Sequence, residues 1–138
     1  MTRGWNGGPV MLTILGQPVS MKNNYVLVKS VKHGRTFMLP NDKVKKYQRA
    51  FNKQVPVLSP LISCEVSVTM RIFYASRQPD LNEDQILDLL QKRVYENDRQ
   101  IWEKHIFKAL DRENPRAEII VAPIELPLFK EVGEQIAN

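Results

Sequence analysis

The chain has 138 residues, a mass of 16.0 kDa and a net charge of +5, a size typical of one globular domain. Its 43% hydrophobic and 25% charged residues exclude a disordered or fibrous protein. One cysteine excludes an internal disulfide and a zinc site built on several thiolates. The N-terminus lacks the apolar stretch of a signal peptide, and no apolar run reaches the ~18 residues of a spanning helix. We therefore expect a single domain over residues 1–138, flexible at 1–8, that is cytoplasmic and has no membrane partner.

The net charge is unevenly distributed along the chain. Residues 1–60 carry ten Lys or Arg and one acid, which gives this segment a charge of +9. Residues 61–138 carry ten bases and fourteen acids, a charge of −4. Such asymmetry indicates an interaction of the basic half with nucleic acid or a membrane surface.

The first half of the chain predicts a strand, a hairpin and a helix. The apolar run at 10–15 is typical of a buried strand. Residues 25–31 and 36–39 flank a His-Gly-Arg turn and are expected to pair as a hairpin. A helix capped by Asn41 or Asp42 is expected to run to about residue 53.

The second half begins with the clearest pattern in the sequence. Apolar and polar residues alternate over 62–74, which predicts a strand with one face on a core. A helix is expected from residue 81 to about 92, and strands at 101–109 and 117–122. The fold class is therefore α+β, with a mixed sheet of about four strands and two main helices.

Three aspartates fall on one side of a helical wheel drawn through the helix expected at 81–92 and the residue before it. At 100° per residue, Asp80, Asp84 and Asp88 fall at about 0°, 40° and 80° of a helical wheel, opposite the apolar side. Carboxylates at this spacing repel one another, and a divalent cation would relieve the repulsion. Mg²⁺ prefers such oxygen ligands, and Asp98 in the next acidic loop could supply another. Taken alone, the pattern is also that of a solvated acidic helix face.

Other catalytic motifs are missing from the sequence. Neither His33 nor His105 has a Ser or Cys partner at recognisable spacing, so a nucleophilic triad is unsupported. No glycine-rich phosphate-binding motif is present. The acidic residues are therefore the main candidates for chemistry.

The basic half predicts a surface that contacts phosphates. Lys and Arg neutralise backbone phosphates, and Asn also donates to them. A solubilising helix surface is the alternative, but solubility alone does not require one sign of charge over sixty residues. No base-reading motif is visible, so sequence-specific recognition is not indicated. The candidates for phosphate contacts in this half are Lys22, Asn23, Asn24, Lys43, Lys45, Lys46 and Arg49.

Over roughly residues 12–122, the chain resembles the RusA-like Holliday junction resolvases of phages and bacteria. Three stretches carry the resemblance: LTILGQPVSMKNNY, MLPNDKVKKY and PDLNEDQILDLLQKRVYENDRQIWEKHIFKALDRENPRAEIIV. The resemblance implies an α+β, homodimeric, Mg²⁺-dependent endonuclease that binds four-way DNA by shape and nicks two strands in recombination and repair. It matches the family's first acid to Asp80 and the acid of its second motif to Asp98.

The resemblance fails at one position. The family usually has a second acid two residues after the first, where this chain has Asn82. Glu83 or Asp84 would take over, and the helical wheel favours Asp84. Asp88 matches a common acidic position of the family. A lysine that some members have just after the acids has no clear counterpart here.

The charges at such a site explain how it would hydrolyse a phosphodiester bond. One or two Mg²⁺ ions, or Mn²⁺, held by Asp80, Asp98 and either Asp84 or Asp88 would activate a water and neutralise the scissile phosphate. Further positive charge for DNA binding and for the transition state is expected from Lys92, Arg93, Arg99 and Lys104.

The expected function is thus a structure-selective DNA endonuclease that resolves Holliday junctions and other branched DNA by paired nicks. The first alternative is a non-catalytic branched-DNA-binding protein with a degenerate acidic site, which the Asn82 departure suggests. The second is a protein-interaction module, which leaves the one-sided charge of residues 1–60 unexplained.

Overall fold

The computed structural model describes residues 4–20, 25–29, 32 and 34–124. They form one four-stranded sheet, a separate two-stranded hairpin, two α-helices and one turn of 3₁₀ helix. In chain order the elements are β1 (Val10–Leu15), β2 (Tyr25–Lys29), β3 (Thr36–Pro40), α1 (Asp42–Gln54), β4 (Val66–Tyr74), α2 (Asp84–Leu90), η1 (Asp98–Gln100), β5 (Ile101–Leu110) and β6 (Arg116–Pro123).

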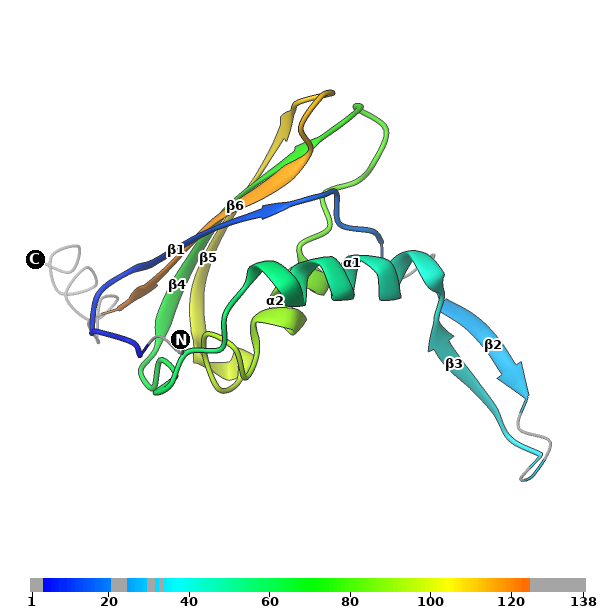
Figure 1. Ribbon diagram of the computed structural model, residues 1–138, viewed down its shortest axis with the longest axis horizontal. Helices are drawn as coiled ribbons and strands as arrows, with labels where there is room; N and C mark the ends of the chain where they lie inside the picture. The colour runs from blue at the N-terminus through cyan, green and yellow to red at the C-terminus, as the bar shows by residue number, and fades with distance from the viewer. Residues whose placement is uncertain (1–3, 21–24, 30–31, 33, 125–138) are drawn as a thin grey trace, which may run out of the picture.

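The main sheet has the strand order β1-β6-β4-β5. Strand β4 pairs with β6 antiparallel and with β5 parallel, so the sheet is mixed. Helices α1 and α2 lie on one side of it (Figure 1). The prediction of an α+β domain with about four strands in a mixed sheet and two helices is confirmed. Among the described residues, neither α1 nor α2 has the length and apolar character that a membrane-spanning helix needs.

The core lies between the sheet and the two helices, and β4 is its centre. Every second side chain of β4 is completely buried, and the residues between them face the other side of the sheet. This is the consequence of the apolar alternation, because successive side chains of a strand point to opposite faces. The fully buried β4 residues are Val66, Val68, Met70, Ile72 and Tyr74.

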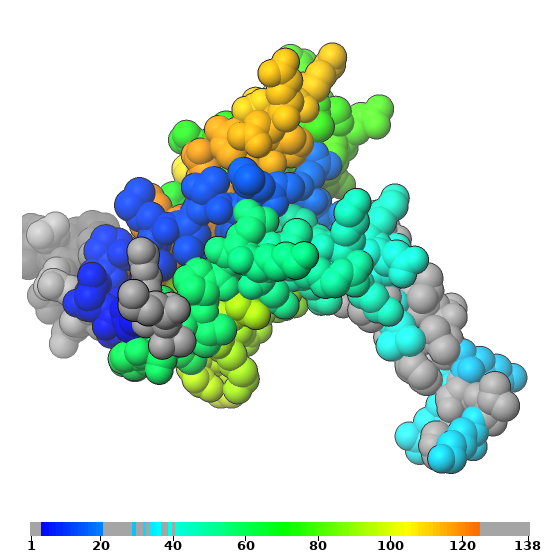
Figure 2. Space-filling model, viewed as in Figure 1, coloured from blue at the N-terminus to red at the C-terminus, as the bar shows by residue number. Residues whose placement is uncertain are grey.

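Helix α1 begins as its sequence predicts. The Asn41 side-chain oxygen accepts a hydrogen bond of 3.2 Å from the Val44 backbone N–H, which satisfies one of the free donors of the first turn. Val44, Tyr47 and Phe51 form its buried face, and the basic residues occupy the others. The hairpin of β2 and β3 precedes α1 and stands out from the rest of the molecule (Figures 1 and 2).

The first residues of the described chain contribute to the core. Trp5 is half-buried and packs against it. Its indole N–H donates to the Gly8 carbonyl at 2.8 Å, and its backbone N–H donates to the Pro60 carbonyl at 3.1 Å. These contacts fix part of the segment that the sequence predicts to be flexible.

Helix α2 is shorter than predicted and covers Asp84–Leu90 rather than 81 to about 92. At its start, the Tyr74 hydroxyl donates to the Asn82 side-chain oxygen and accepts a hydrogen bond of 3.0 Å from the Asn82 backbone N–H. At its end, Gln91 is extended and Lys92 has a positive φ of 64°. Contacts with β4 and a left-handed residue therefore set the two ends.

The buried side chain of Gln85 holds α2 to two other segments. Its amide nitrogen donates to the Val44 carbonyl at 3.1 Å, and its amide oxygen accepts a hydrogen bond of 3.3 Å from the Val19 backbone N–H. A buried amide with both of its polar atoms bonded fixes position without a desolvation penalty. Gln85 thereby places α2 beside α1 and beside the segment that follows β1.

Candidate active site

Three aspartates line a single cleft of about 550 Å³. Asp84 and Asp88 come from the exposed side of α2, one helical turn apart, and Asp98 is the first residue of η1. The structure thus brings together three of the four acids that the sequence singles out. The rest of the lining consists of Leu87, Ile101, Trp102, Glu103 and Lys104.

The fourth acid, Asp80, does not line this cleft. It is exposed in the loop between β4 and α2, near the Tyr74 hydroxyl. The prediction that it shares a helical face with Asp84 and Asp88 is wrong, because the helix begins only at Asp84. A role for Asp80 in metal binding stays a prediction that the family resemblance alone supports.

Asn82, the position that departs from the family pattern, has a structural role here. Its side-chain oxygen and backbone N–H both bond the buried Tyr74 hydroxyl. Burial raises the pKa of Tyr74, and the charges of Glu83 and Asp80 add to the effect. Tyr74 therefore stays a neutral donor toward Asn82.

The loop that carries Asp98 is fixed by the side chain of Gln100. Its amide oxygen accepts hydrogen bonds from the backbone N–H groups of Glu96 and Asn97, at 2.8 and 2.9 Å. Its amide nitrogen donates to the carbonyls of Ile62 and Cys64, at 2.8 and 3.0 Å. One side chain thus ties the Asp98 loop to the chain that enters β4.

Tyr95 fixes the same loop to α2. Its ring is completely buried, and its hydroxyl donates to the Leu87 carbonyl at 2.7 Å. The Asp98 backbone N–H also donates to the Gln91 side-chain oxygen, at 3.3 Å. These bonds keep Asp98 beside the helix that carries Asp84 and Asp88.

The carboxylates of the cleft repel one another. The pKa of Asp88 is raised above its ordinary value by partial burial, by the charge of Asp98 and by the charge of Asp84. Glu103 adds a further negative charge at the rim, because the hydrogen bond with His105 lowers its pKa. Lys104 is the single cation among the residues that line the cleft. The cleft therefore favours a cationic occupant.

The donor set fits a hard divalent cation. It consists of carboxylate oxygens, which Mg²⁺ prefers, with no His or Cys. Among the described residues, no three His, Cys, Asp or Glu side chains form a group that could hold a metal ion. Mg²⁺ is usually bound through one or two carboxylates and keeps several waters, so this arrangement agrees with its ordinary coordination.

The structure separates the predicted phosphate-binding residues into groups. Lys104 lines the cleft, with its Nζ 3.5 Å from a Glu83 carboxylate oxygen. Arg99 is exposed next to Asp98. The four bases of α1 lie on its exposed faces: Lys43, Lys45, Lys46 and Arg49. Three predicted residues lie outside the described part of the chain: Lys22, Asn23 and Asn24.

Two further bases in this set have other partners. The Arg93 guanidinium donates to the Val55 carbonyl at 2.8 Å, just after the end of α1. Lys92 pairs with Glu96 at 3.3 Å on the surface. Arg93 therefore connects the α2 region to the end of α1, and its assignment to DNA binding stays a prediction.

Sequence reasoning missed Trp102 and Glu103. Both line the cleft, and the Trp102 side chain is 62% exposed. The available signal was their position, directly after the second acidic motif in NDRQIWEK. The same residues also fit an ordinary strand, so the sequence offers no reason to assign a function to them.

The comparison with family models gave one finding. A model described as "Endodeoxyribonuclease RusA" matches residues 16–122, a region that contains every residue lining the cleft. A comparison with curated proteins gave no match.

The raised pKa of Asp88 predicts the effect of Asp88→Asn on stability. In the folded, metal-free protein Asp88 binds a proton more tightly than in the unfolded chain, so its charged form costs stability at neutral pH and the cost declines as the pH falls toward its ordinary pKa of 3.8. We expect the variant to raise the Tm at pH 7 in EDTA by about 1–3 °C. The gain should shrink as the pH is lowered toward 4.

Thermal denaturation with Glu96→Gln as control checks this expectation. Glu96 is an exposed carboxylate of the same loop that lies outside the cleft lining. Mg²⁺ should raise the Tm of the wild type more than that of Asp88→Asn. A lower Tm for Asp88→Asn at pH 7 in EDTA would contradict charge repulsion in the cleft.

Proposed function

The chain belongs to the RusA endodeoxyribonuclease family, whose model matches more than half of its length, and from this premise we propose a Mg²⁺-dependent nuclease that resolves Holliday junctions and other branched DNA by paired nicks. The family assignment makes the protein a nuclease of a kind that acts on Holliday junctions. The observation that carries the finer proposal is the cleft in which Asp84, Asp88 and Asp98 meet.

Different residues of the cleft would have different roles in phosphodiester hydrolysis. One or two of the cleft aspartates Asp84, Asp88 and Asp98 would bind the cation directly, and the remaining carboxylate would act through its waters. Such a cation would polarise the phosphate and lower the pKa of a bound water. Lys104 lies in the same cleft and offers positive charge to the phosphate as its negative charge grows. The Gln100 and Tyr95 contacts hold Asp98 in place, so the carboxylates need little rearrangement.

The basic surfaces would bind the arms of the DNA. The bases of α1 are exposed, and α1 lies beside α2, which carries two of the aspartates. The hairpin projects from the body (Figures 1 and 2). It adds three exposed bases. These bases are Lys29, Lys32 and Arg35. A projecting basic arm and a basic helix suit recognition of DNA shape through its phosphates.

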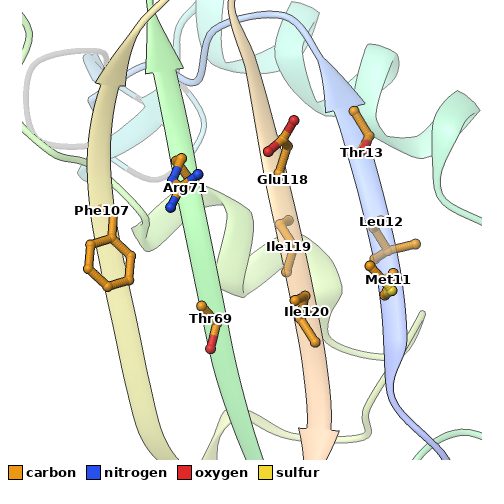
Figure 3. A pocket seen from close by; sticks show the side chains of 9 residues that line it. All are labelled: Met11, Leu12, Thr13, Thr69, Arg71, Phe107, Glu118, Ile119 and Ile120. Atoms are coloured by element: carbon orange, nitrogen blue, oxygen red, sulfur yellow. The ribbon is translucent and has the colours of Figure 1, made fainter.

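The open face of the main sheet supports a homodimer. No helix of the described residues covers this face, and its side chains line a hollow of about 480 Å³ (Figure 3). Large apolar side chains are exposed on it, with Met11 at 74% and Phe107 at 50%. Exposed apolar patches of this kind mark interaction surfaces.

Charges on this face fit a second copy of the chain. Arg71 of β4 and Glu118 of β6 are register partners at its centre. Within the described residues Arg71 has no ion-pair partner, and Glu118 pairs with Arg116 at 3.1 Å through one carboxylate oxygen. A two-fold axis between them would place each Arg71 against the Glu118 of the other subunit, as a self-complementary interface requires. Two such subunits would present two equivalent clefts to a four-way junction.

Substitution of the cleft aspartates tests the nuclease proposal. We expect Asp98→Asn and Asp84→Asn to reduce cleavage of a synthetic four-way junction in Mg²⁺ by about 100-fold or more, because each removes a carboxylate that supports several kcal/mol of metal-ion catalysis. Binding of the junction should be retained, since the change removes a negative charge. Glu96→Gln is the matched control and should cleave within about twofold of the wild type.

The same assay separates the rival function and the contribution of Asp80. A wild-type protein that binds the junction but does not cut it in Mg²⁺ would identify a non-catalytic binding protein. A loss for Asp80→Asn as large as that for Asp98→Asn would extend the ligand set to the loop before α2.

The basic face of α1 predicts a steep dependence of binding on salt. Each phosphate contact contributes about 0.9 to the slope of log K against log[salt]. Replacing Lys45 and Arg49 by Gln should reduce the magnitude of this slope by about 1–2 for the junction. Arg112→Gln, on the exposed β5–β6 connection, is the control and should leave the slope unchanged. A slope near zero for the wild type would contradict a phosphate-dominated interface.

A charge exchange tests the dimer. We expect the wild type to have twice the 16.0 kDa mass of the chain in light scattering. Arg71→Glu should dissociate it, because like charges would face one another across the axis, and Arg71→Glu with Glu118→Arg should restore the dimer. An unchanged mass for Arg71→Glu, with a normal circular dichroism spectrum, would place the interface elsewhere.

A further inference from the structure

Trp102 is the exposed tryptophan of the described structure, and it lies at the acidic cleft. Its side chain is 62% exposed, whereas Trp5 is half-buried with its indole bonded to Gly8. Large aromatic side chains gain much of their stabilisation from burial. Folding alone therefore does not explain why a tryptophan at this cleft stays mostly exposed to water.

An irregularity in strand pairing places this side chain. Val66 of β4 pairs with Ile101 of β5, but the next residue, Ser67, pairs with Glu103. Trp102 is thus the extra residue of a β-bulge and has no partner on β4. Bulges re-aim side chains and are common next to active sites. Here the bulge puts the indole into the lining of the cleft with Asp88 and Asp98.

The surroundings of Trp102 indicate what it would contact. Its neighbours on β5 are Ile101 and Glu103, and most of the residues that line the cleft with it are charged, so the indole does not belong to a broad apolar patch. The same cleft holds the acids and the lysine proposed to act on a phosphate. A ligand with an aromatic face next to a phosphate matches this combination, and a nucleotide of DNA is such a ligand.

We propose that Trp102 stacks on an unstacked base beside the scissile phosphate and so positions the strand that is cut. The proposal rests on the nuclease function proposed above and adds a means of recognising the branch point. Every base has a π-face that an aromatic side chain can cover, without regard to sequence. In continuous duplex these faces are covered by neighbouring base pairs, whereas a branch point can expose them. Trp102 would therefore favour branched over linear DNA.

The native fluorescence of Trp102 provides a direct test. Trp5→Phe leaves Trp102 as the single tryptophan of the chain. This protein is titrated in EDTA, to prevent cleavage, with a four-way junction and with linear duplex of the same sequence. We expect strong quenching by the junction and little by the duplex at equal occupancy, which is measured separately by anisotropy of labelled DNA.

Three substitutions of Trp102, made in the wild-type chain, separate stacking from packing. Stacking is worth about 1–3 kcal/mol per base, so Trp102→Leu and Trp102→Ala should weaken junction binding about 5- to 150-fold while Trp102→Phe retains most of the affinity. Affinity for linear duplex should change little in all three. Leu110→Ala, an exposed apolar residue at the other end of β5, is the control and should bind normally. The Tm of each variant reports its folding.

The outcomes distinguish this inference from the function on which it rests. Junction cleavage by Trp5→Phe with no quenching of Trp102, or normal junction binding by Trp102→Leu, would overturn stacking and leave the nuclease proposal standing. Quenching by the junction together with loss of binding in Trp102→Leu supports stacking, whether or not cleavage is observed. A protein that neither binds nor cuts the junction would overturn both.

Discussion

The parallel pairing of β4 with β5 is the constraint on which the candidate site depends. Parallel neighbours cannot be joined by a tight hairpin, so the chain must leave the end of β4 and return to the start of β5. The return carries α2 across the sheet and ends in η1, which leads directly into β5. Asp84 and Asp88 on the helix and Asp98 at the end of the return therefore meet in one cleft. The same return leaves Asp80 at the opposite end of the crossover, just after β4.

The alternation of β4 made the fold predictable, and contacts distant in sequence limited what else could be predicted. One buried face on a central strand was readable from 62–74, and the strand itself covers Val66–Tyr74. The presence of strand β1 and the cap of α1 also followed from local patterns. The expectation that β1 is buried is wrong, because β1 is an edge strand of the sheet and only its Ile14 is buried. The ends of α2 did not, because Tyr74 holds Asn82 out of the helix, and the helix ends at the extended Gln91 and the left-handed Lys92. Neither feature changes the helical spacing of apolar residues in the sequence.

The candidate site shows the same division between local and non-local information. Asp84 and Asp88 are one turn apart in any helix, so sequence spacing was enough to place them together. The loop of Asp98 is fixed by the Gln100 side chain, whose hydrogen-bond partners at Ile62 and Cys64 lie far away in the chain. Trp102 lines the cleft at the position where β5 carries an extra residue opposite β4. A bulge is a property of strand pairing and cannot be read from one strand alone.

The separation of charge along the sequence becomes a separation in space. A nuclease must attract a polyanion and also present carboxylates to it, and these two requirements oppose each other electrostatically. The chain places the three cleft aspartates in the β4–β5 crossover and exposed bases on α1 and the hairpin. Since α1 and α2 are neighbours, a phosphate backbone held by α1 would pass close to the repelling carboxylates. A bound cation would cancel that repulsion, so DNA and metal should each strengthen the binding of the other.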